Sequence, residues 1–253
     1  MRTMRTNGIW RMGNTRQLTL TALAMAVASS MVLAGLLSGC VNVAGYTQPT
    51  LVRVIDASYV APAINVLAEG ITIAGNVGQG TISPYATLAA TTSGSVKIAN
   101  AATGDSLTTT SNPFLAGRQY SIYLTDIGNP PTSYTVSVIT DQQTAAASGH
   151  SDFRFLNQAI GTGAVDVYMV PNGSTLAQSI PLVSNLAVGA SFNYVDFASQ
   201  TVTMVVTPTG KTTPSYTSST IYLGGGEVRT VLLVDAKLTS NPPILAYMVS
   251  DVN

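Results

Sequence analysis

The chain has 253 residues, of which 46% are apolar and 9% are charged, with one Cys and one His. A soluble domain normally has about a quarter of its residues charged, so this sequence is poor in charge. Apart from the four arginines of residues 1–39, seven basic residues stand against eleven acidic ones, a net charge of −4. Because nucleic-acid binding needs clustered Lys and Arg, we exclude nucleic acid as a partner.

Residues 1–39 are predicted to be a secretory signal. Arginines within residues 1–16 precede an uncharged apolar run from Leu18 to Leu37, and small residues follow it. A basic start, an apolar middle and small residues before a cleavage site are typical of such signals. The run is also close to the length of a membrane span, so a permanent anchor helix is the alternative. Translation can start at Met1, Met4 or Met12.

Cys40 is the only cysteine and stands where the apolar run ends. Leu-Ser-Gly-Cys at 37–40 resembles the lipobox of bacterial lipoproteins, which implies cleavage before Cys40 and acylation of this residue. Two or three acyl chains hold a protein on a membrane where one chain does not. We therefore predict lipidation at Cys40, a tether over residues 40–50, and attachment in the bacterial cell envelope. In that resemblance Val41, in place of Asp, favours the outer membrane, at its periplasmic face or at the cell surface.

The pattern is that of β-strands from Leu51 onward. Val52 and Val54, and then Ile64 and Val66, occupy alternate positions, the period of a strand with one buried face. Further strands are expected at 94–99, 119–125 and 133–140, with Gly and Pro between them. Short strands at this spacing predict a sandwich or barrel rather than alternating strands and helices.

The second half of the chain repeats the first. Arg53 and Asn65 correspond to Arg154 and Asp166 at the same offset of 101, and later matches drift to an offset of 112. A repeat of this length is a duplicated domain, because solenoid units are far shorter. We predict an all-β chain of two tandem β-sandwich domains of immunoglobulin-like size, at 51–141 and 152–253. Residues 142–151 are the predicted linker, and the first copy is expected to fold alone in a chain ending near Thr140.

Both copies resemble a bacterial family named "domain of unknown function 4397". The resemblance rests on Arg-Val-Ile-Asp-Ala-Ser at 53–58 and Ala-Pro-Ala-Ile-Asn-Val at 61–66, and on Ala-Val-Asp-Val-Tyr at 164–168. Asp56 stands where the family has His, and Asn65 where it has Asp. The resemblance implies an exported β-sandwich, often in tandem and often lipid-anchored, and it supplies no activity.

Few residues are suited to catalysis. His150, the only His, falls in the predicted linker, and Cys40 is assigned to lipid. We therefore predict no enzyme activity, no catalytic residues, no cofactor and no metal site. Four aspartates at strand positions or strand ends are the remaining candidates: Asp56, Asp126, Asp166 and Asp235. Turn capping is favoured for them over a Ca²⁺ or sugar site, because their spacing is unlike a calcium loop. A carboxylate hydrolase would need two acids facing one cleft.

The equivalent arginines Arg53 and Arg154 are predicted to be structural, either facing solvent or paired with an acid of their own copy. Asp166 is the candidate partner of Arg154, whereas Asn65 cannot serve Arg53. Tyrosines outnumber the other aromatics and offer a platform for sugar or protein, although on strands they are more often at the edge of a core. They are Tyr59, Tyr85, Tyr120, Tyr123, Tyr134, Tyr168, Tyr194, Tyr216, Tyr222 and Tyr247.

The sequence thus favours a non-catalytic lipoprotein of the cell envelope that acts as a structural, adhesion or protein-interaction module. Its partners would be the membrane, through Cys40, and an envelope protein or glycan. The alternative is a surface lipoprotein that binds a glycan or small ligand. Clustering of the paired residues between the copies would favour binding, and their dispersal over the surface would favour the structural role.

Overall fold

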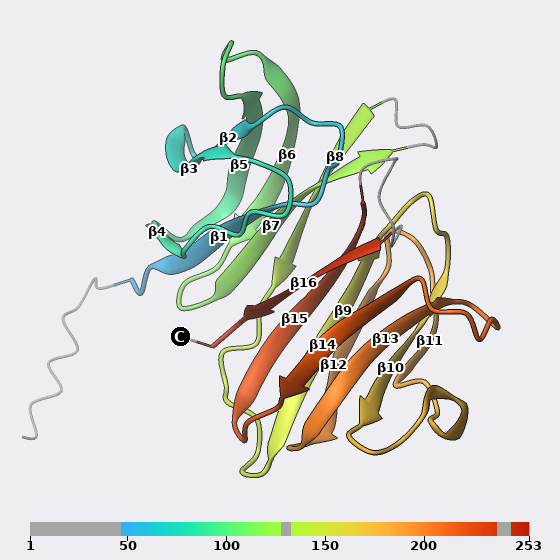
Figure 1. The fold of residues 1–253 in the computed structure, drawn as a ribbon. Coiled ribbons are helices and arrows are strands. Elements are labelled where there is room, and N and C mark those ends of the chain that lie inside the picture. The colour runs from blue at the N-terminus through green and yellow to red at the C-terminus, as the bar shows by residue number, and fades with distance from the viewer. Residues whose placement is uncertain (1–46, 128–132, 237–243, 253) are drawn as a thin grey trace, which may run out of the picture. The chain divides into compact units, whose positions relative to one another are not determined.

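The computed structural model describes residues 47–127, 133–236 and 244–252. The predicted signal, Cys40 and most of the predicted tether lie outside these residues. Within these ranges the chain forms sixteen strands and one short 3-10 helix (Figure 1). No helix in the described ranges is long and apolar enough to cross a membrane.

The first copy is a pair of four-stranded sheets, ordered β4-β1-β7-β8 and β3-β2-β5-β6. In each sheet the neighbours are antiparallel except β1 and β7, which run parallel. The strands are β1 (Thr50–Asp56), β2 (Ile64–Ala68), β3 (Ile71–Val77), β4 (Ala86–Leu88), β5 (Thr91–Asn100), β6 (Ser106–Phe114), β7 (Gln119–Ile127) and β8 (Ser133–Thr140).

The second copy repeats this topology with each strand label raised by eight. Its sheets are β12-β9-β15-β16 and β11-β10-β13-β14, and β9 runs parallel to β15. The elements are β9 (His150–Gln158), β10 (Val165–Pro171), η1 (Leu176–Gln178), β11 (Val183–Leu186), β12 (Ser191–Ala198), β13 (Thr201–Pro208), β14 (Tyr216–Tyr222), β15 (Glu227–Asp235) and β16 (Ile244–Ser250). The predicted all-β fold of two sandwich-like domains is confirmed, and β9 begins inside the range predicted as linker.

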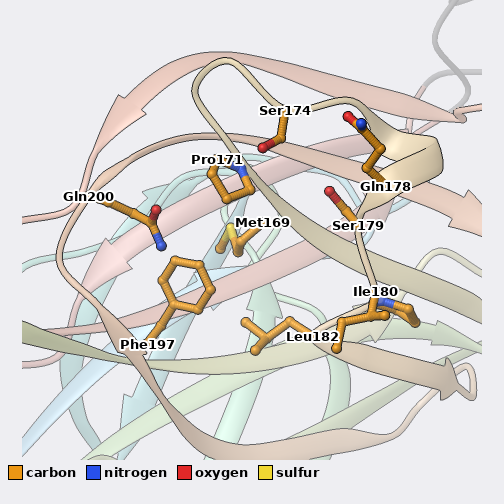
Figure 2. Close-up of a pocket in the computed structure, with 10 residues that line it drawn as sticks. Met169, Pro171, Ser174, Gln178, Ser179, Ile180, Leu182, Phe197 and Gln200 are labelled. Atoms are coloured by element: carbon orange, nitrogen blue, oxygen red, sulfur yellow. The ribbon is translucent and has the colours of Figure 1, made fainter.

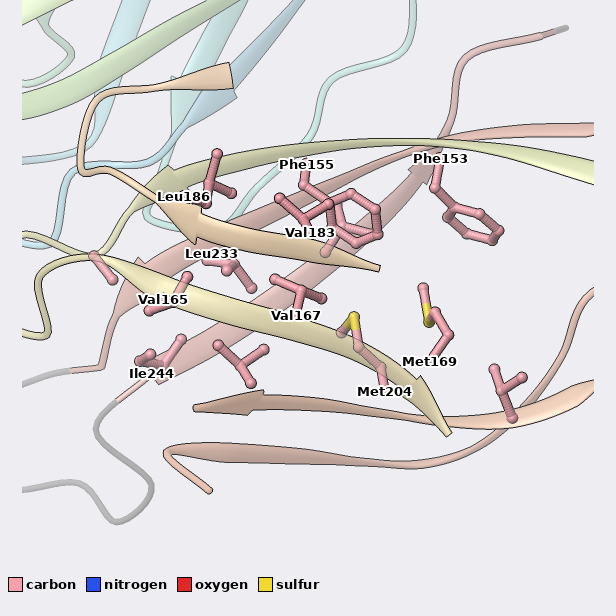
Figure 3. Close-up of a cluster of buried hydrophobic side chains, with 14 of the residues drawn as sticks. Phe153, Phe155, Val165, Val167, Met169, Val183, Leu186, Met204, Leu233 and Ile244 are labelled. Atoms are coloured by element: carbon pink, nitrogen blue, oxygen red, sulfur yellow. The ribbon is translucent and has the colours of Figure 1, made fainter. Parts of the chain in front are cut away.

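Each copy has its own apolar core between its two sheets. In β5 the alternation of Val96 and Ile98, both buried, with exposed Ser95 and Lys97 directs one face of the strand inward. Figure 3 shows the corresponding core of the second copy, where the rings of Phe153 and Phe155 stack with centroids 6.2 Å apart. The predominantly apolar inner faces account for the cohesion of each sandwich.

A third apolar cluster joins the two copies. It contains Ile55, Ala57 and Tyr123 from the first copy and Leu156, Leu232 and Val234 from the second. These residues lie on the faces of β1, β7, β9 and β15 that point away from the core of their own copy, so the four strands are covered on both sides. In β7 all residues but the last are buried, including the polar residues Gln119, Ser121, Thr125 and Asp126. Residues 47–253 accordingly form one compact unit.

The copies differ most on one flank. In the first copy β2 and β3 are joined by the tight turn of Glu69 and Gly70, both at positive φ. In the second copy the corresponding connection runs from residue 172 to 182 and contains η1. The neighbouring edge strand also grows, from three residues in β4 to eight in β12.

Candidate functional site

Arg53, on β1, is buried between the two copies with 2% of its surface exposed. Its Nη1 donates a hydrogen bond of 2.6 Å to the carbonyl oxygen of Ser250, and its Nη2 donates to the carboxylate of Asp251. Its Nε donates to Ser121 Oγ, on the neighbouring strand of its own copy, at 2.7 Å. The guanidinium therefore binds its own sheet on one side and the end of the other copy on the other.

Arg154 makes the same contacts with the two copies exchanged. Its Nη1 donates to the carbonyl oxygen of Thr140 at 2.8 Å, and its Nη2 donates to Asp141. Its Nε donates to Thr230 Oγ1 at 3.0 Å. Each arginine thus reaches the residue pair that ends the last strand of the opposite copy, so the interface has an approximate twofold relationship.

The two carboxylates are also satisfied from their own copies. Asp141 accepts hydrogen bonds from Ser121 Oγ at 2.6 Å and from the hydroxyl of Tyr85 at 2.7 Å. Asp251 accepts equivalent bonds from Thr230 Oγ1 at 2.6 Å and from the hydroxyl of Tyr194 at 2.7 Å. Burying a carboxylate is tolerable only when it is paired and hydrogen-bonded, and both of these carboxylates are.

Two tyrosine rings cover the arginines. The Cζ of Arg53 lies 4.8 Å from the ring centroid of Tyr85, and that of Arg154 lies 4.9 Å from the centroid of Tyr194. A guanidinium at this distance from an aromatic face is attracted by its electrons. Each tyrosine therefore contacts the arginine of one ion pair with its ring and the carboxylate of the other pair with its hydroxyl, and both of these residues belong to its own copy.

Burial and neighbouring charges shift the pKa of the arginines and tyrosines of this network. Burial by itself would lower the pKa of Arg53, but the charges of Asp141 and Asp251 outweigh this effect and the pKa is raised. Burial, together with the nearby carboxylates, raises the pKa of the hydroxyls of Tyr85 and Tyr194. The tyrosines therefore remain neutral hydrogen-bond donors at physiological pH.

A second polar group, at the ends of β1, β7 and β15, is acidic. Asp126 accepts hydrogen bonds from Ser58 Oγ and from the backbone N–H of Tyr59, and Asp235 accepts one from the N–H of Gly161. Asp56 accepts one from the N–H of Ser58, and its Oδ2 is buried without a partner. Burial, with a contribution from the charge of Asp126, raises the pKa of Asp56 to about 7. In the described ranges, no group of three or more His, Cys, Asp or Glu is arranged to hold a metal ion.

The structure confirms the predicted capping role of the aspartates and corrects the predicted partner of Arg154. Asp166 accepts hydrogen bonds from the backbone N–H groups of Asn185 and Gly210, at 2.7 and 2.9 Å, and not from the arginine. Asn65 caps the equivalent turn, accepting from the N–H of Asn76 at 2.9 Å. The acid closest to Arg154 is Asp141 of the other copy, and Asp251 of its own copy lies 3.9 Å away, because the arginine points away from its own core.

The paired arginines do cluster between the copies, the arrangement that was expected to favour ligand binding. They are nevertheless buried and bonded to each other's copies, so the cluster is a structural element and offers no open site. Sequence reasoning missed Asp141 and Asp251. A signal for them was present, because Thr140-Asp141 and Ser250-Asp251 occupy equivalent positions after the last strand of each copy.

The remaining candidate residues, His150 and the tyrosines, are dispersed over the structure. His150 is the first residue of β9, and its Nδ1 lies 2.8 Å from Oδ2 of Asp196 at the surface. Tyr123 is fully buried in the cluster between the copies, where burial raises the pKa of its hydroxyl to about 12. Tyr222 is the tyrosine with a large exposed surface, at 71%. The other described tyrosines are buried or half-buried, as expected for residues at the edge of a core.

One protein-family model matches part of the chain. Residues 50–168 match the family described as "Domain of unknown function (DUF4397)". The family resemblance is confirmed over this range. The DUF4397 match begins with β1 and ends within β10, so it covers the whole first copy and the opening strands of the second.

No curated protein matches the chain in sequence. Among solved structures, the chain is similar to CBMbc, a family CBM26 protein from Eubacterium rectale Amy13K, crystallised in complex with maltoheptaose. The two are 12% identical over 79% of this chain and 96% of that chain, with a TM-score of 0.24. At this TM-score the likeness carries no argument about a ligand or a site.

Proposed function

We propose that this chain is a non-catalytic lipoprotein of the bacterial cell envelope, in which the two DUF4397-like copies act as a single rigid module for structure or protein interaction. The lipid would be carried by Cys40, and the outer membrane is the proposed location. An envelope protein is the proposed partner of the module. The described unit, residues 47–253, would then be held close to the membrane by the short tether of residues 40–50.

One observation supports this proposal above the others: the reciprocal pairing of Arg53 with Asp251 and of Arg154 with Asp141. Tandem domains joined only by a linker move independently unless their interface is large and apolar. Here an apolar cluster and two buried ion pairs fix the copies together. A fixed pair of sandwiches suits a spacer or scaffold, because the positions of its two ends are set by the fold.

The acidic groups support a structural role rather than turnover. Asp56, Asp126 and Asp235 expose 0, 8 and 8% of their surfaces, and each binds backbone N–H groups of nearby turns. A glycosidase needs two carboxyl groups that face a bound sugar across an open cleft. These carboxyl groups are covered instead, so we propose no hydrolytic activity for them.

The anchor is tested by replacing Cys40. Expression of the full chain in a Gram-negative host with a fatty-acid probe should label the wild type, and Cys40→Ala should give an unlabelled precursor of unchanged length. Ser38→Ala, which keeps a small residue beside the predicted cleavage site, is the matched control and should be labelled. Normal labelling of Cys40→Ala would refute the lipoprotein assignment.

A second candidate function is binding of a glycan or small ligand. The specific observation that favours it is a surface pocket in the second copy, formed where the two copies differ most. Ligand binding at this pocket would be independent of the lipid anchor.

A further inference from the structure

A pocket of about 540 Å³ opens on the flank of the second sandwich (Figure 2). Met169 on β10 lies at its centre, Phe197 on β12 forms one wall, and residues of the connection between β10 and β11 form the opposite wall. Gln200, in the turn after β12, completes the rim. Pockets that bind small molecules fall in this size range and have apolar walls with a few polar groups.

The pocket exists because of additions that the first copy lacks. Residues 172–182 replace the two-residue turn of the first copy, and η1 within them gives the wall its shape. Strand pairing places Phe197 opposite Ser151 and Leu88 opposite Thr50, which are equivalent positions in the two copies. Leu88 is buried in the first core, with 2% exposure, whereas Phe197 is only partly buried and lines the pocket. The same fold is therefore complete without the pocket, which is an elaboration of the second copy.

The polar groups of the pocket keep hydrogen-bonding capacity for a ligand. Gln178 Oε1 accepts from the backbone N–H and the hydroxyl of Thr175, which fixes the side chain and leaves its amide N–H₂ as a donor. The hydroxyl of Ser179 donates to the carbonyl oxygen of Thr175, which leaves its lone pairs as acceptors. Figure 2 shows the side-chain amide of Gln200 directed toward Met169 and Phe197. Donors and acceptors thus stand beside an aromatic ring.

The character of the lining selects the class of ligand. None of its ten residues is charged, so the pocket offers no ion pair to an anionic or cationic ligand. Four of the ten carry amide or hydroxyl side chains, namely Ser174, Gln178, Ser179 and Gln200. A hydrocarbon chain would leave the amide N–H groups of Gln178 and Gln200 without a partner in the ligand, at a cost. Ile180, at the rim, exposes 87% of its surface and adds apolar area beside the opening.

We propose that this pocket binds a neutral saccharide, with the C–H face of one sugar ring against Phe197 and its hydroxyls bonded to the amides of Gln178 and Gln200. A sugar ring has an apolar face and a rim of neutral hydroxyls, which matches an uncharged lining of one aromatic ring, five other apolar residues, and four amide or hydroxyl side chains. The inference deepens the second candidate function and rests on it. It is separable from the lipid anchor and from the joining of the two copies.

The test is calorimetric titration of the purified full chain with cellobiose and with N,N′-diacetylchitobiose, using glucuronate and palmitate as charged and acyl competitors. We expect saturable binding of at least one of the two disaccharides in the millimolar range or tighter, with no competition from glucuronate or palmitate. Phe197→Leu, which keeps apolar volume but removes the ring, should weaken this binding about tenfold or more, and so should Gln200→Ala. Tyr222→Ala, at an exposed tyrosine outside the pocket, is the control and should bind like the wild type.

Three results would overturn the inference: no saturable binding of either disaccharide, binding that is insensitive to both pocket substitutions, or displacement by palmitate. Thermal melts of each variant identify any loss of folding. If Phe197→Leu does not fold, Gln200→Ala decides the question, because this partly exposed turn residue lies outside the apolar cores. Failure of this test leaves the lipid-labelling result for Cys40→Ala unaffected, so the two outcomes are distinguishable.

Discussion

Arg53 and Asp251 are 198 residues apart in sequence and form a buried ion pair that joins the opening strand of the first sandwich to the end of the second. Arg154 and Asp141 form the equivalent pair in the opposite direction. Each copy supplies the arginine of one pair and the carboxylate of the other, so the shortest ion pairs cross between the copies, while the arginine and carboxylate within each copy lie 3.6 and 3.9 Å apart. The duplication has thus produced an internal analogue of a symmetric dimer.

Arg53→Met should destabilise the protein strongly. The substitution leaves Asp251 buried next to its remaining hydroxyl donors and removes its closest cation, an arrangement that typically costs about 3–5 kcal/mol. The measurement is the free energy of unfolding from urea titration. Arg229→Met is the matched control, because the Arg229–Glu227 pair is 26% and 31% exposed and such pairs contribute at most about 1 kcal/mol. Equal losses of unfolding free energy in Arg53→Met and Arg229→Met would contradict the role assigned to Arg53.

Gly80→Ala should destabilise more than Gly104→Ala. Both glycines have positive φ, at +71° and +77°, so the backbone strain of the substitution is matched. A Cβ at Gly80 would lie 2.1 Å from Cζ of Tyr247 in the second copy, whereas nothing lies within 4 Å of a Cβ at Gly104. Since the ring of Tyr247 must swing away from the interface, we expect an additional loss of about 1 kcal/mol. The difference should vanish in a Tyr247→Ala background, and its persistence there would refute contact between these residues.

Asp56→Asn should flatten the dependence of stability on pH. The pKa of Asp56 is raised to about 7 in the folded protein, against about 3.9 in an unfolded chain. The folded state therefore binds this proton more tightly, and the resulting stabilisation is complete below about pH 4 and disappears as the pH rises through 7. Asn157, at the equivalent position, donates from Nδ2 to the carbonyl oxygens of Gly163 and Leu186, both at 2.9 Å, so an amide suits this site.

Melting temperatures from pH 4 to 8 check this expectation. The wild type should lose several degrees relative to Asp56→Asn as the pH rises, and the variant should be the more stable of the two at pH 8. Asp105→Asn, in an exposed turn, is the control and should follow the wild type. Parallel profiles for Asp56→Asn and the wild type would show that Asp56 is not a protonated buried acid.

Much of the fold follows from local sequence patterns, and the joining of the copies does not. Alternation places Val52 and Val54 on one face of β1, and the same alternation places Arg53 and Ile55 on the other. An apolar Ile55 beside an arginine indicates that this outer face is covered, but the pattern within a strand does not identify the covering element. The sequence therefore offers Asp166, an acid of the same copy, as a candidate partner of Arg154, with a solvent-facing arginine as the alternative, whereas the structure bonds Arg154 to Asp141.

The pocket was beyond sequence reasoning for a different reason. The offset between the copies drifts from 101 to 112, which indicates an insertion. The drift does not show that the inserted residues 172–182 fold back beside Phe197 and Gln200. Only the register of β12 against β9 establishes that Phe197 replaces the buried Leu88 of the first copy.

The expectation that the first copy folds alone is changed by the interface. A chain ending near Thr140 would lose both Asp141 and Asp251, leaving Arg53 without an acidic partner. It would also expose Ile55, Ala57 and Tyr123. We now expect such a fragment to be partly unfolded or self-associated, as circular dichroism and sedimentation would show. A monomeric fragment with a cooperative melt would support independent domains.

Calorimetric unfolding of the chain tests the central claim that the two sandwiches form one unit. If the buried ion pairs and the apolar cluster join the copies, residues 47–253 should unfold in one transition whose calorimetric and van't Hoff enthalpies agree. Two separate transitions, with Arg53→Met shifting neither, would show that the copies are independent domains and would contradict the account.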